Sequence, residues 1–190
     1  MYFFTADHHF GHENIIRHAG RPFASVEEMT EELIARHNDT VSPRDQVFLL
    51  GDVGYRLPPR YLAQCLGRMR GRKLLLPGNH DRRLIHKGQR KGVFDELCRH
   101  GHLQILGDYH ELKLSWRNRR LLLVLFHYPL CTWNGKTNGT WHLHGHSHGQ
   151  LAPCSRRVDC GVDVWDFRPA ALDAALARGL APSESLCLDN

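Results

Sequence analysis

Short apolar runs alternate with helical patterns along the first half of the chain. The apolar runs, which are typical of buried strands, cover residues 2–6, 46–50 and 73–76. Residues 27–38 place apolar side chains at helical spacing behind Ser25, a residue type that commonly caps a helix. Residues 59–70 predict a second helix, because they begin with proline and end before Gly71. This strand–helix–strand–helix–strand order predicts an α/β fold with a layered core of parallel strands.

The second half of the chain has a different pattern, in which strands follow one another before a single helix. The expected strands cover residues 111–116, 121–126, 141–144 and 157–164. Because residues 117–120 have the pattern of a turn, we expect this half to be mostly antiparallel. Residues 169–178 predict a closing helix that begins with proline and ends at Gly179. The whole pattern predicts one domain over residues 1–180 and a frayed tail over residues 181–190.

The composition predicts a globular protein with no membrane-spanning segment. Of the 190 residues, 42% are hydrophobic and 24% are charged, which argues against a disordered chain. No run of about 18 apolar residues is present, and the opening "MYFFTAD" lacks the features of a secretory signal. We therefore expect a cytoplasmic location and no membrane partner. None of the six cysteines forms a C-x-x-C pair, and we expect free thiols rather than a disulfide framework, with Cys154 and Cys160 close enough to pair if the strand geometry allows it.

The net charge of +5 fits an anionic partner, such as a phosphate ester or a nucleic acid. A basic surface without any such partner also explains this charge. Basic residues cluster in residues 68–73, 82–91 and 117–120, and no cluster interleaves with aromatic residues in a nucleic-acid-binding pattern. Charge alone leaves both interpretations open.

Potential metal ligands follow the ends of five predicted strands. In chain order they are Asp7 and His9, then Asp52, then Asn79 and His80, then His127, and finally His146 and His148. In open α/β sheets, ligands bind beyond the carboxyl ends of the strands, so we expect these side chains to meet at one edge. On an extended chain, residues two apart point the same way, so Asp7 and His9 would share a side and His8 would point away.

Each of these motifs is weak when it stands alone, because an isolated D-x-H, GD or GNH is usually a turn or a solvated surface. Five such motifs, each directly after a strand, together indicate a metal site. The donors are nitrogen and oxygen atoms with no thiolate, a set that suits Mn, Fe, Zn or Ni better than Mg or Ca.

The ordered motifs D-x-H, GD, GNHD, a lone histidine and GHxH resemble those of the calcineurin-like metallophosphoesterase superfamily, over residues 7–148. The wider context "DHHFGHENII", "HYPLCTWNG" and "VDVWDFRP" is similar to a small bacterial and phage branch of phosphoesterases with no assigned substrate. The resemblance implies a four-layer α/β/β/α sandwich of two mixed sheets flanked by helices, with two metal ions between the sheets.

The resemblance also implies a role for each motif residue. Asp7, His9, Asp52 and His148 would bind one divalent ion, and Asp52, Asn79, His127 and His146 would bind a second. Asp52 would bridge the two ions, which we expect to be Mn, with Fe, Zn or Ni as alternatives. A metal-bridging hydroxide would attack phosphorus in line. His80 and Asn79 would contact the phosphate, and His80 would act as a general acid or transition-state donor.

Three further residues remain open at this stage. Tyr55 stands where some relatives carry an aspartate that orients the general-acid histidine. His12 either contacts substrate or is a bystander, and Arg82 either meets a phosphate or is a surface arginine. Glu13 is expected on the solvated surface.

The function expected from the sequence is hydrolysis of a small phosphate ester, with a nucleotide-type phosphodiester as the first candidate. A DNA or RNA nuclease is the alternative, which the basic charge permits. A metal-binding scaffold without turnover is the third candidate, and the complete ligand set argues against it. The sequence leaves the oligomeric state open.

Overall fold

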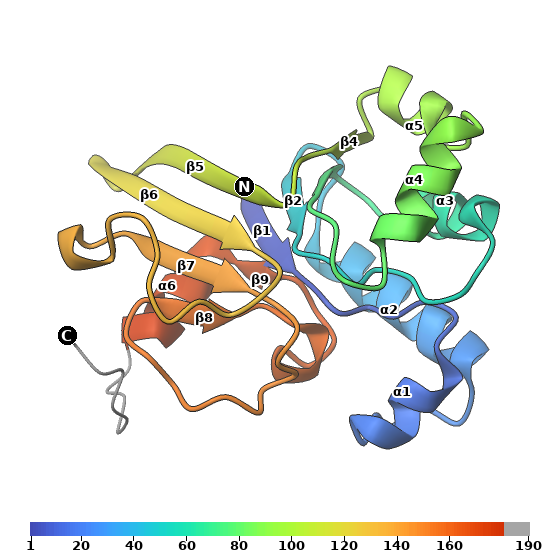
Figure 1. The fold of residues 1–190 in the computed structure, drawn as a ribbon, viewed down its shortest axis with the longest axis horizontal. Helices are drawn as coiled ribbons and strands as arrows, with labels where there is room; N and C mark the ends of the chain where they lie inside the picture. Colours follow the sequence, from blue (N-terminus) through green and yellow to red (C-terminus); the bar gives the residue numbers. More distant parts are fainter. Residues whose placement is uncertain (181–190) are drawn as a thin grey trace.

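Two mixed β-sheets form the centre of the protein in the computed structural model, which describes residues 1–180 (Figure 1). The five-stranded sheet has the order β4-β3-β2-β1-β9, from Leu103–Ile105, Arg72–Leu75, Gln46–Leu49, Tyr2–Thr5 and Ala170–Ala171. The four-stranded sheet has the order β5-β6-β7-β8, from Tyr109–Trp116, Arg119–Phe126, Trp141–His144 and Arg157–Asp159. Strands β1 to β4 are parallel, and β9 is antiparallel to β1. The expected α/β class with two mixed sheets flanked by helices is confirmed at this level.

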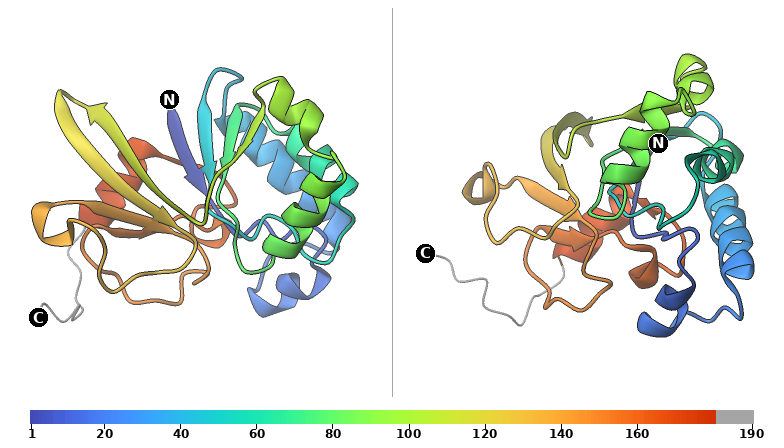
Figure 2. Two further views of the ribbon diagram at one scale, coloured as in Figure 1. Left: turned by 45° about the horizontal axis from the view of Figure 1, so that its top comes forward. Right: turned by 45° about the vertical axis from the view of Figure 1, so that its right-hand side comes forward.

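Helices cover the face of the five-stranded sheet that points away from the other sheet. The helices are α1 (Glu13–His18), α2 (Val26–Thr40), α3 (Pro59–Arg68), α4 (Arg82–Arg90), α5 (Asp95–Arg99) and α6 (Leu172–Leu180). Figure 2 shows α2, α3 and α4 together on one side of this sheet, opposite β5 and β6. Helix α6 contacts β8, β9 and β1, which belong to both sheets.

Alternating side chains on the parallel strands divide the apolar core into two layers. Phe3 and Val47 pack with the helices, whereas their neighbours Phe4 and Phe48 pack toward the second sheet. This alternation follows from the two-residue period of a strand, and both faces are apolar because both are covered. The sheet is thereby held rigidly from both sides, which fixes the positions of the loops at its carboxyl edge.

The predicted elements of the first half are confirmed to within two residues at each end. Helix α2 begins after Ser25, whose hydroxyl accepts a hydrogen bond from the backbone N–H of Glu28 at 3.1 Å. The Glu28 carboxylate in turn accepts one from the backbone N–H of Ala24 at 2.6 Å. This reciprocal cap satisfies two N–H groups that a helix start would otherwise leave unpaired.

Three expectations for the second half are wrong. In the four-stranded sheet, β5 and β6 are antiparallel, whereas β6, β7 and β8 are parallel, because the segment after β6 crosses over before β7. Strand β8 ends at Asp159, and a short helix, Val162–Val164, replaces the rest of the predicted strand. The closing helix begins later than expected, because Ala170–Ala171 pairs with β1 as strand β9.

The remaining expectations concern cysteines, the membrane and the tail. Cys65, Cys98, Cys131 and Cys160 are free thiols as expected. Cys154 is disulfide-bonded, so the expectation is wrong there, because a disulfide leaves no local sequence pattern. No helix within residues 1–180 is both long and apolar enough to cross a membrane. The predicted frayed tail, residues 181–190, lies outside the described residues.

Lys73 is the largest buried cation among the strands, and it predicts a specific pH dependence of stability. Its ammonium group donates to the Met69 carbonyl at 2.6 Å, and burial lowers the pKa of Lys73 to about 8. Between about pH 8 and pH 10.5 the unfolded chain binds more protons at this residue, so its contribution to the free energy of unfolding rises with pH. The rise has an upper limit of about 3 kcal/mol.

The substitution Lys73→Met isolates this contribution. We expect the free energy of unfolding of the wild type, relative to that of the variant, to increase as pH rises through this interval. Urea unfolding at a series of pH values measures the difference. Parallel pH profiles of the two proteins would contradict the buried-ammonium interpretation.

Candidate metal centre

The loops after β1 and β2 are joined by backbone hydrogen bonds, which bring the first three predicted ligands together. Asp7 N–H donates to the Gly51 carbonyl at 3.0 Å, and His9 N–H donates to the Asp52 carbonyl at 2.9 Å. Because β1 and β2 are parallel neighbours, both loops leave the same edge of the sheet. Asp7, His9 and Asp52 therefore lie at the carboxyl edge, as the sequence predicts.

Five predicted ligands adopt left-handed backbone conformations. Their φ angles are 60° for Asp7, 54° for His9, 51° for Asp52, 69° for His146 and 47° for His148. Such conformations cost non-glycine residues about 1–3 kcal/mol each and concentrate at functional sites. The expectation of an extended Asp7-x-His9 segment is wrong, because both residues have a left-handed backbone that turns the chain sharply. These turns, and not an extended strand, bring the two side chains together.

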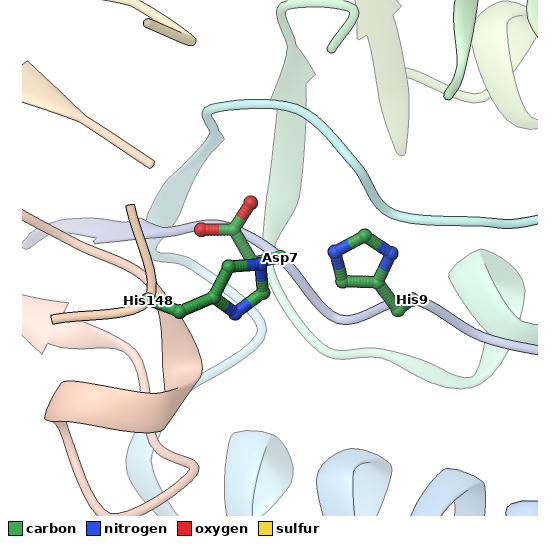
Figure 3. Close-up of side chains that lie close together, drawn as sticks. All are labelled: Asp7, His9 and His148. Carbon is green, nitrogen blue, oxygen red and sulfur yellow. The ribbon is translucent and has the colours of Figure 1, made fainter. Parts of the chain in front are cut away.

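Asp7, His9 and His148 form the first group of ligands, shown in Figure 3. One ligand atom from each lies within 4.8 Å of the others. Asp7 accepts hydrogen bonds from the backbone N–H of His146 through both carboxylate oxygens, at 3.1 and 2.9 Å. Burial raises the pKa of Asp7 to about 7, even though His148 and His127 oppose that shift. A divalent cation at this point would stabilise the ionised carboxylate.

Asp52, His127 and His146 form the second group, again with ligand atoms within 4.8 Å of one another. His127 Nδ1 lies 2.8 Å from the Leu50 carbonyl, which fixes Nδ1 as the protonated nitrogen. His127 Nε2 then faces the site, 2.9 Å from the Asn79 side-chain oxygen. Asn79 and His127 are thus placed beside Asp52, where the resemblance puts the second ion.

Asp52 belongs to the second group and also to a third, with His9 and His80, whose ligand atoms again lie within 4.8 Å of one another. One carboxylate oxygen is 3.9 Å from His9 Nε2 and 3.5 Å from His127 Nε2. The other oxygen accepts the backbone N–H of His80 at 2.9 Å. Burial alone would raise the pKa of Asp52, but hydrogen bonding and attraction to His127 lower it to about 2. An ionised carboxylate oxygen thus faces ligands of both groups.

The donor atoms fit divalent ions with nitrogen and oxygen ligands. Both ring nitrogens of His9 are buried and have no hydrogen-bond partner, which is costly for an imidazole unless a ligand completes the site. The groups of possible ligands within residues 1–180 are made only of histidine and aspartate. A histidine–carboxylate set of this kind suits Mn, Fe, Zn or Ni.

A buried ion pair that the sequence did not reveal holds His148 in position. His148 Nδ1 lies 2.7 Å from Asp163, and Arg21 Nε donates to the same carboxylate at 2.7 Å. Arg21 also donates to the Asp7 carbonyl at 2.7 Å and to the His8 carbonyl at 3.0 Å. With Nδ1 bonded to the carboxylate, His148 presents Nε2 to the ligand group. No local signal marks this pair, because Arg21 and Asp163 are 142 positions apart.

Two further aspartates that sequence reasoning missed brace the ligand loops. Asp81 accepts the backbone N–H groups of Val53, Gly54 and Gly78 at 3.0–3.2 Å, and so ties the loops after β2 and β3 together. Asp159 accepts the Ser147 hydroxyl at 2.7 Å and the Gly149 N–H at 2.9 Å, which holds the loop of His146 and His148. Asp81 is the last residue of the "GNHD" motif, and this motif is the one sequence signal that could have revealed its role.

The other predicted site residues surround the ligands. His80 is exposed, with Nε2 3.7 Å from the Asp52 carboxylate. His12 is half-buried, with its ring centroid 5.3 Å from that of His9 and 3.8 Å from that of Tyr55, on which it stacks. Tyr55 meets the His80 ring edge-on at 4.9 Å. Tyr55 therefore contacts the rings of both histidines. It occupies the position at which some members of the superfamily that the sequence resembles carry an orienting aspartate.

Three other residues named in the sequence analysis lie away from the ligand groups. Arg82 is 54% exposed and pairs with Asp108 at 3.0 Å, and no contact joins it to the ligand groups. Glu13 is exposed, as expected. His8 points away from the ligands into the core, where it stacks on Phe10 at 5.3 Å. Its Nδ1 is buried without a hydrogen-bond partner.

Comparison with known proteins shows relatives without an assigned function. No protein-family model matches the chain. The uncharacterized protein MJ1445 of Methanocaldococcus jannaschii is 27% identical over 179 residues, which cover 90% of this chain and 86% of that protein. The crystal structure of AQ665 from Aquifex aeolicus, a protein of unknown function, superposes with a TM-score of 0.60 at 19% identity. That match covers 90% of this chain and 94% of AQ665, and it shows a shared fold.

Proposed function

We propose that the protein is a dinuclear metal-dependent phosphoesterase of the calcineurin-like metallophosphoesterase type. The observation that carries this proposal is the position of Asp52, which groups with His127 and His146 on one side and with His9 and His80 on the other. A shared carboxylate with a histidine-rich group on each side is the arrangement that a two-ion hydrolase needs. The four-layer α/β/β/α sandwich of that superfamily and a cytoplasmic location remain expectations from the sequence.

The resemblance implies two ligand sets that share Asp52. Asp7, His9, Asp52 and His148 would hold one ion, and Asp52, Asn79, His127 and His146 would hold the other, with Mn expected first. Two bound ions would polarise the phosphate and supply a hydroxide nucleophile at neutral pH. The strained backbone and the braced loops hold the ligands in place before any ion arrives, which lowers the cost of organising the site.

His80 and Asn79 would meet the substrate, which we expect to be a nucleotide-type phosphodiester. His80 is exposed beside the Asp52 carboxylate, so its Nε2 can reach a group bound over the centre. There it would donate a proton to the leaving oxygen or a hydrogen bond to the developing charge. Tyr55 and His12 pack against this ring and limit its orientation.

A substrate and metal panel tests the proposed function. We expect the purified chain with added Mn²⁺ to hydrolyse bis(p-nitrophenyl) phosphate, and EDTA to stop the reaction. The panel should also contain p-nitrophenyl phosphate and cyclic nucleotides, each with Mn²⁺, Ni²⁺, Zn²⁺ and Mg²⁺. Failure to hydrolyse any ester with any ion would refute the proposal.

The substitution His80→Ala should separate turnover from metal binding. We expect kcat to fall by about 10²–10⁴-fold, which is the usual contribution of a general acid. Metal content, measured by elemental analysis, should stay at the wild-type value because His80 is outside the two ligand sets. His86→Ala on the exposed face of α4 is the matched control, with kcat expected within twofold of wild type. Loss of metal from the His80→Ala protein would reassign His80 as a ligand.

The substitution Asp163→Asn should weaken metal binding without touching a ligand. Removal of the carboxylate behind a ligating histidine typically costs about 10–100-fold in metal affinity, and we expect a loss in this range. Calorimetric titration with Mn²⁺ measures the effect. Asp166→Asn is the control, because Asp166 is exposed and pairs with Arg36. Equal affinity in the Asp163→Asn protein and the wild type would show that the pair with Arg21 serves the fold alone.

A further inference from the structure

The exposed face of helix α4 carries five cations and no acid. These residues are Arg82, Arg83, Lys87, Arg90 and Lys91, all exposed. Like charges four residues apart destabilise a helix, and Arg82 and Arg83 in the first turn oppose the helix dipole, whereas Lys87 and Arg90 in the last turn complement it. Within residues 1–180, the ion pair between Arg82 and Asp108 is the one that joins this face to an acid. The face is thus unfavourable by itself, and a polyanion would relieve its repulsion.

A row of aromatic rings leads away from the candidate metal centre on the other side. Tyr128 meets the His146 ring at 4.8 Å between centroids, and Phe126 meets Tyr128 at 5.5 Å. Tyr109, which pairs with Phe126 across β5 and β6, continues the row at 6.4 Å. Tyr109 is 45% exposed, and Phe126 and Tyr128 are partly exposed. The row thus joins a predicted metal ligand to the surface.

The basic face and the aromatic row begin next to each other. Helix α4 starts two residues after His80, and its first residue, Arg82, pairs with Asp108 at 3.0 Å. Asp108 directly precedes Tyr109 in the chain, where β5 begins (Figure 1). One ion pair therefore connects the two surfaces beside the candidate metal centre. The sequence conceals this arrangement, because the cations and the rings come from segments at least 18 residues apart.

We propose that this composite surface binds a single-stranded nucleic acid, with phosphates along α4, bases on the aromatic row, and one phosphodiester at the metal centre. Only the cleavage step of this inference rests on the proposed function; the binding of the strand does not. Cations beside exposed aromatic rings are how proteins bind single strands without regard to sequence. An acidic peptide carries no nucleobase on each unit for the rings to stack on, and a membrane surface would not extend into the metal centre. Hydrolysis would add the OH of water to phosphorus and its proton to the leaving oxygen.

Fluorescence anisotropy with a labelled oligonucleotide of about 12 nucleotides tests the binding, with the full chain in EDTA so that cleavage is absent. The double substitution R83E/K87E should weaken binding at least tenfold and reduce the slope of log Kd against log salt by about 2. The control R119E/R120E makes the same charge change at the far end of β6, and its affinity should stay within twofold of wild type.

The aromatic row is tested with an abasic strand of equal length and charge. The wild type should bind the strand with bases about 5- to 150-fold more tightly than the abasic one. Tyr109→Ala should lower this ratio, whereas Tyr109→Phe should keep it. Tyr61→Ala is the matched control, since Tyr61 is 39% exposed on α3. Circular dichroism verifies that each variant is folded.

The outcomes separate the two proposals. Oligonucleotide binding that fails at about 50 mM salt, with hydrolysis of bis(p-nitrophenyl) phosphate intact, overturns this inference and leaves the phosphoesterase proposal standing. Oligonucleotide binding without hydrolysis of any ester would support this inference and refute the phosphoesterase proposal. Equal affinity for polyglutamate or for phosphatidylserine vesicles would replace the nucleic acid by an acidic protein or a membrane, and so would overturn the inference. Equal affinity for the abasic strand overturns the stacking part.

Discussion

The substitution Asp52→Asn is expected to disable both halves of the metal centre at once. Asp52 is the residue that the two proposed ligand sets share, so a neutral amide removes the negative charge between His9 and His127. We expect the Mn²⁺ content to fall below one ion per chain and diester hydrolysis to fall by at least about 10³-fold. Elemental analysis and the hydrolysis rate measure the two effects independently.

The Asp52→Asn protein should remain folded, which distinguishes a functional loss from a structural one. Asparagine tolerates the left-handed conformation at this position, and its amide oxygen can still accept the His80 N–H. Asp45→Asn is the control, because Asp45 is a buried aspartate that accepts Ser42 N–H and lies away from the ligands. Normal metal content in the Asp52→Asn protein would remove the shared-ligand argument on which the phosphoesterase proposal depends.

The substitution Gly51→Ala is expected to have the largest effect on stability. Gly51 has a φ of +95°, and a Cβ there would lie 2.5 Å from His127 Nδ1 and 2.7 Å from the Gly78 backbone. His127 is fixed by its bond to the Leu50 carbonyl, and the Gly78 contact is with backbone, so neither neighbour can move easily. We expect a loss of more than about 3 kcal/mol in the free energy of unfolding, from overpacking together with backbone strain.

Gly20→Ala separates the two causes. Gly20 has a φ of +61°, and a Cβ there would have no neighbour within 4 Å. This variant should lose only the conformational term, about 1 kcal/mol. Urea unfolding of both variants and the wild type provides the comparison. Similar losses in the two glycine variants would mean that the close packing of the β2 and β3 loops around His127 is not rigid.

The sequence predicted well which histidine and aspartate side chains meet at the edge of the sheet, because their signal is local. Each ligand follows a strand directly, and a parallel sheet brings its strand ends to one edge. The connection between β6 and β7 shows where this reasoning fails. Parallel neighbours normally need a helical crossover, yet residues 127–140 cross with only the short helix Lys136–Asn138. An irregular crossover has no periodic pattern, so these strands were predicted to be antiparallel.

The supporting contacts of the site could not be predicted from the sequence at all. Arg21 comes before α2 and Asp163 comes after β8, and only the folded chain places them on either side of His148. The same holds for Tyr109 and Arg82, which the strand pairing and the ion pair bring to one surface. Local patterns show which residues can do chemistry, whereas long-range contacts determine which of them act together.

The left-handed ligands set stability and function against each other. Of the eleven non-glycine residues with positive φ in residues 1–180, five are predicted ligands, and two others, Arg117 and Asn118, form the tight turn between β5 and β6. Glycine would relieve the strain at Asp7, His9, Asp52, His146 and His148. A lineage that no longer needed the metal centre would gain stability by drifting to glycine at His9, whose buried ring makes no hydrogen bond, whereas Asp7 and Asp52 also accept backbone hydrogen bonds. A side chain that persists at such a position is maintained by the function of the protein, although glycine would relieve the strain in the backbone.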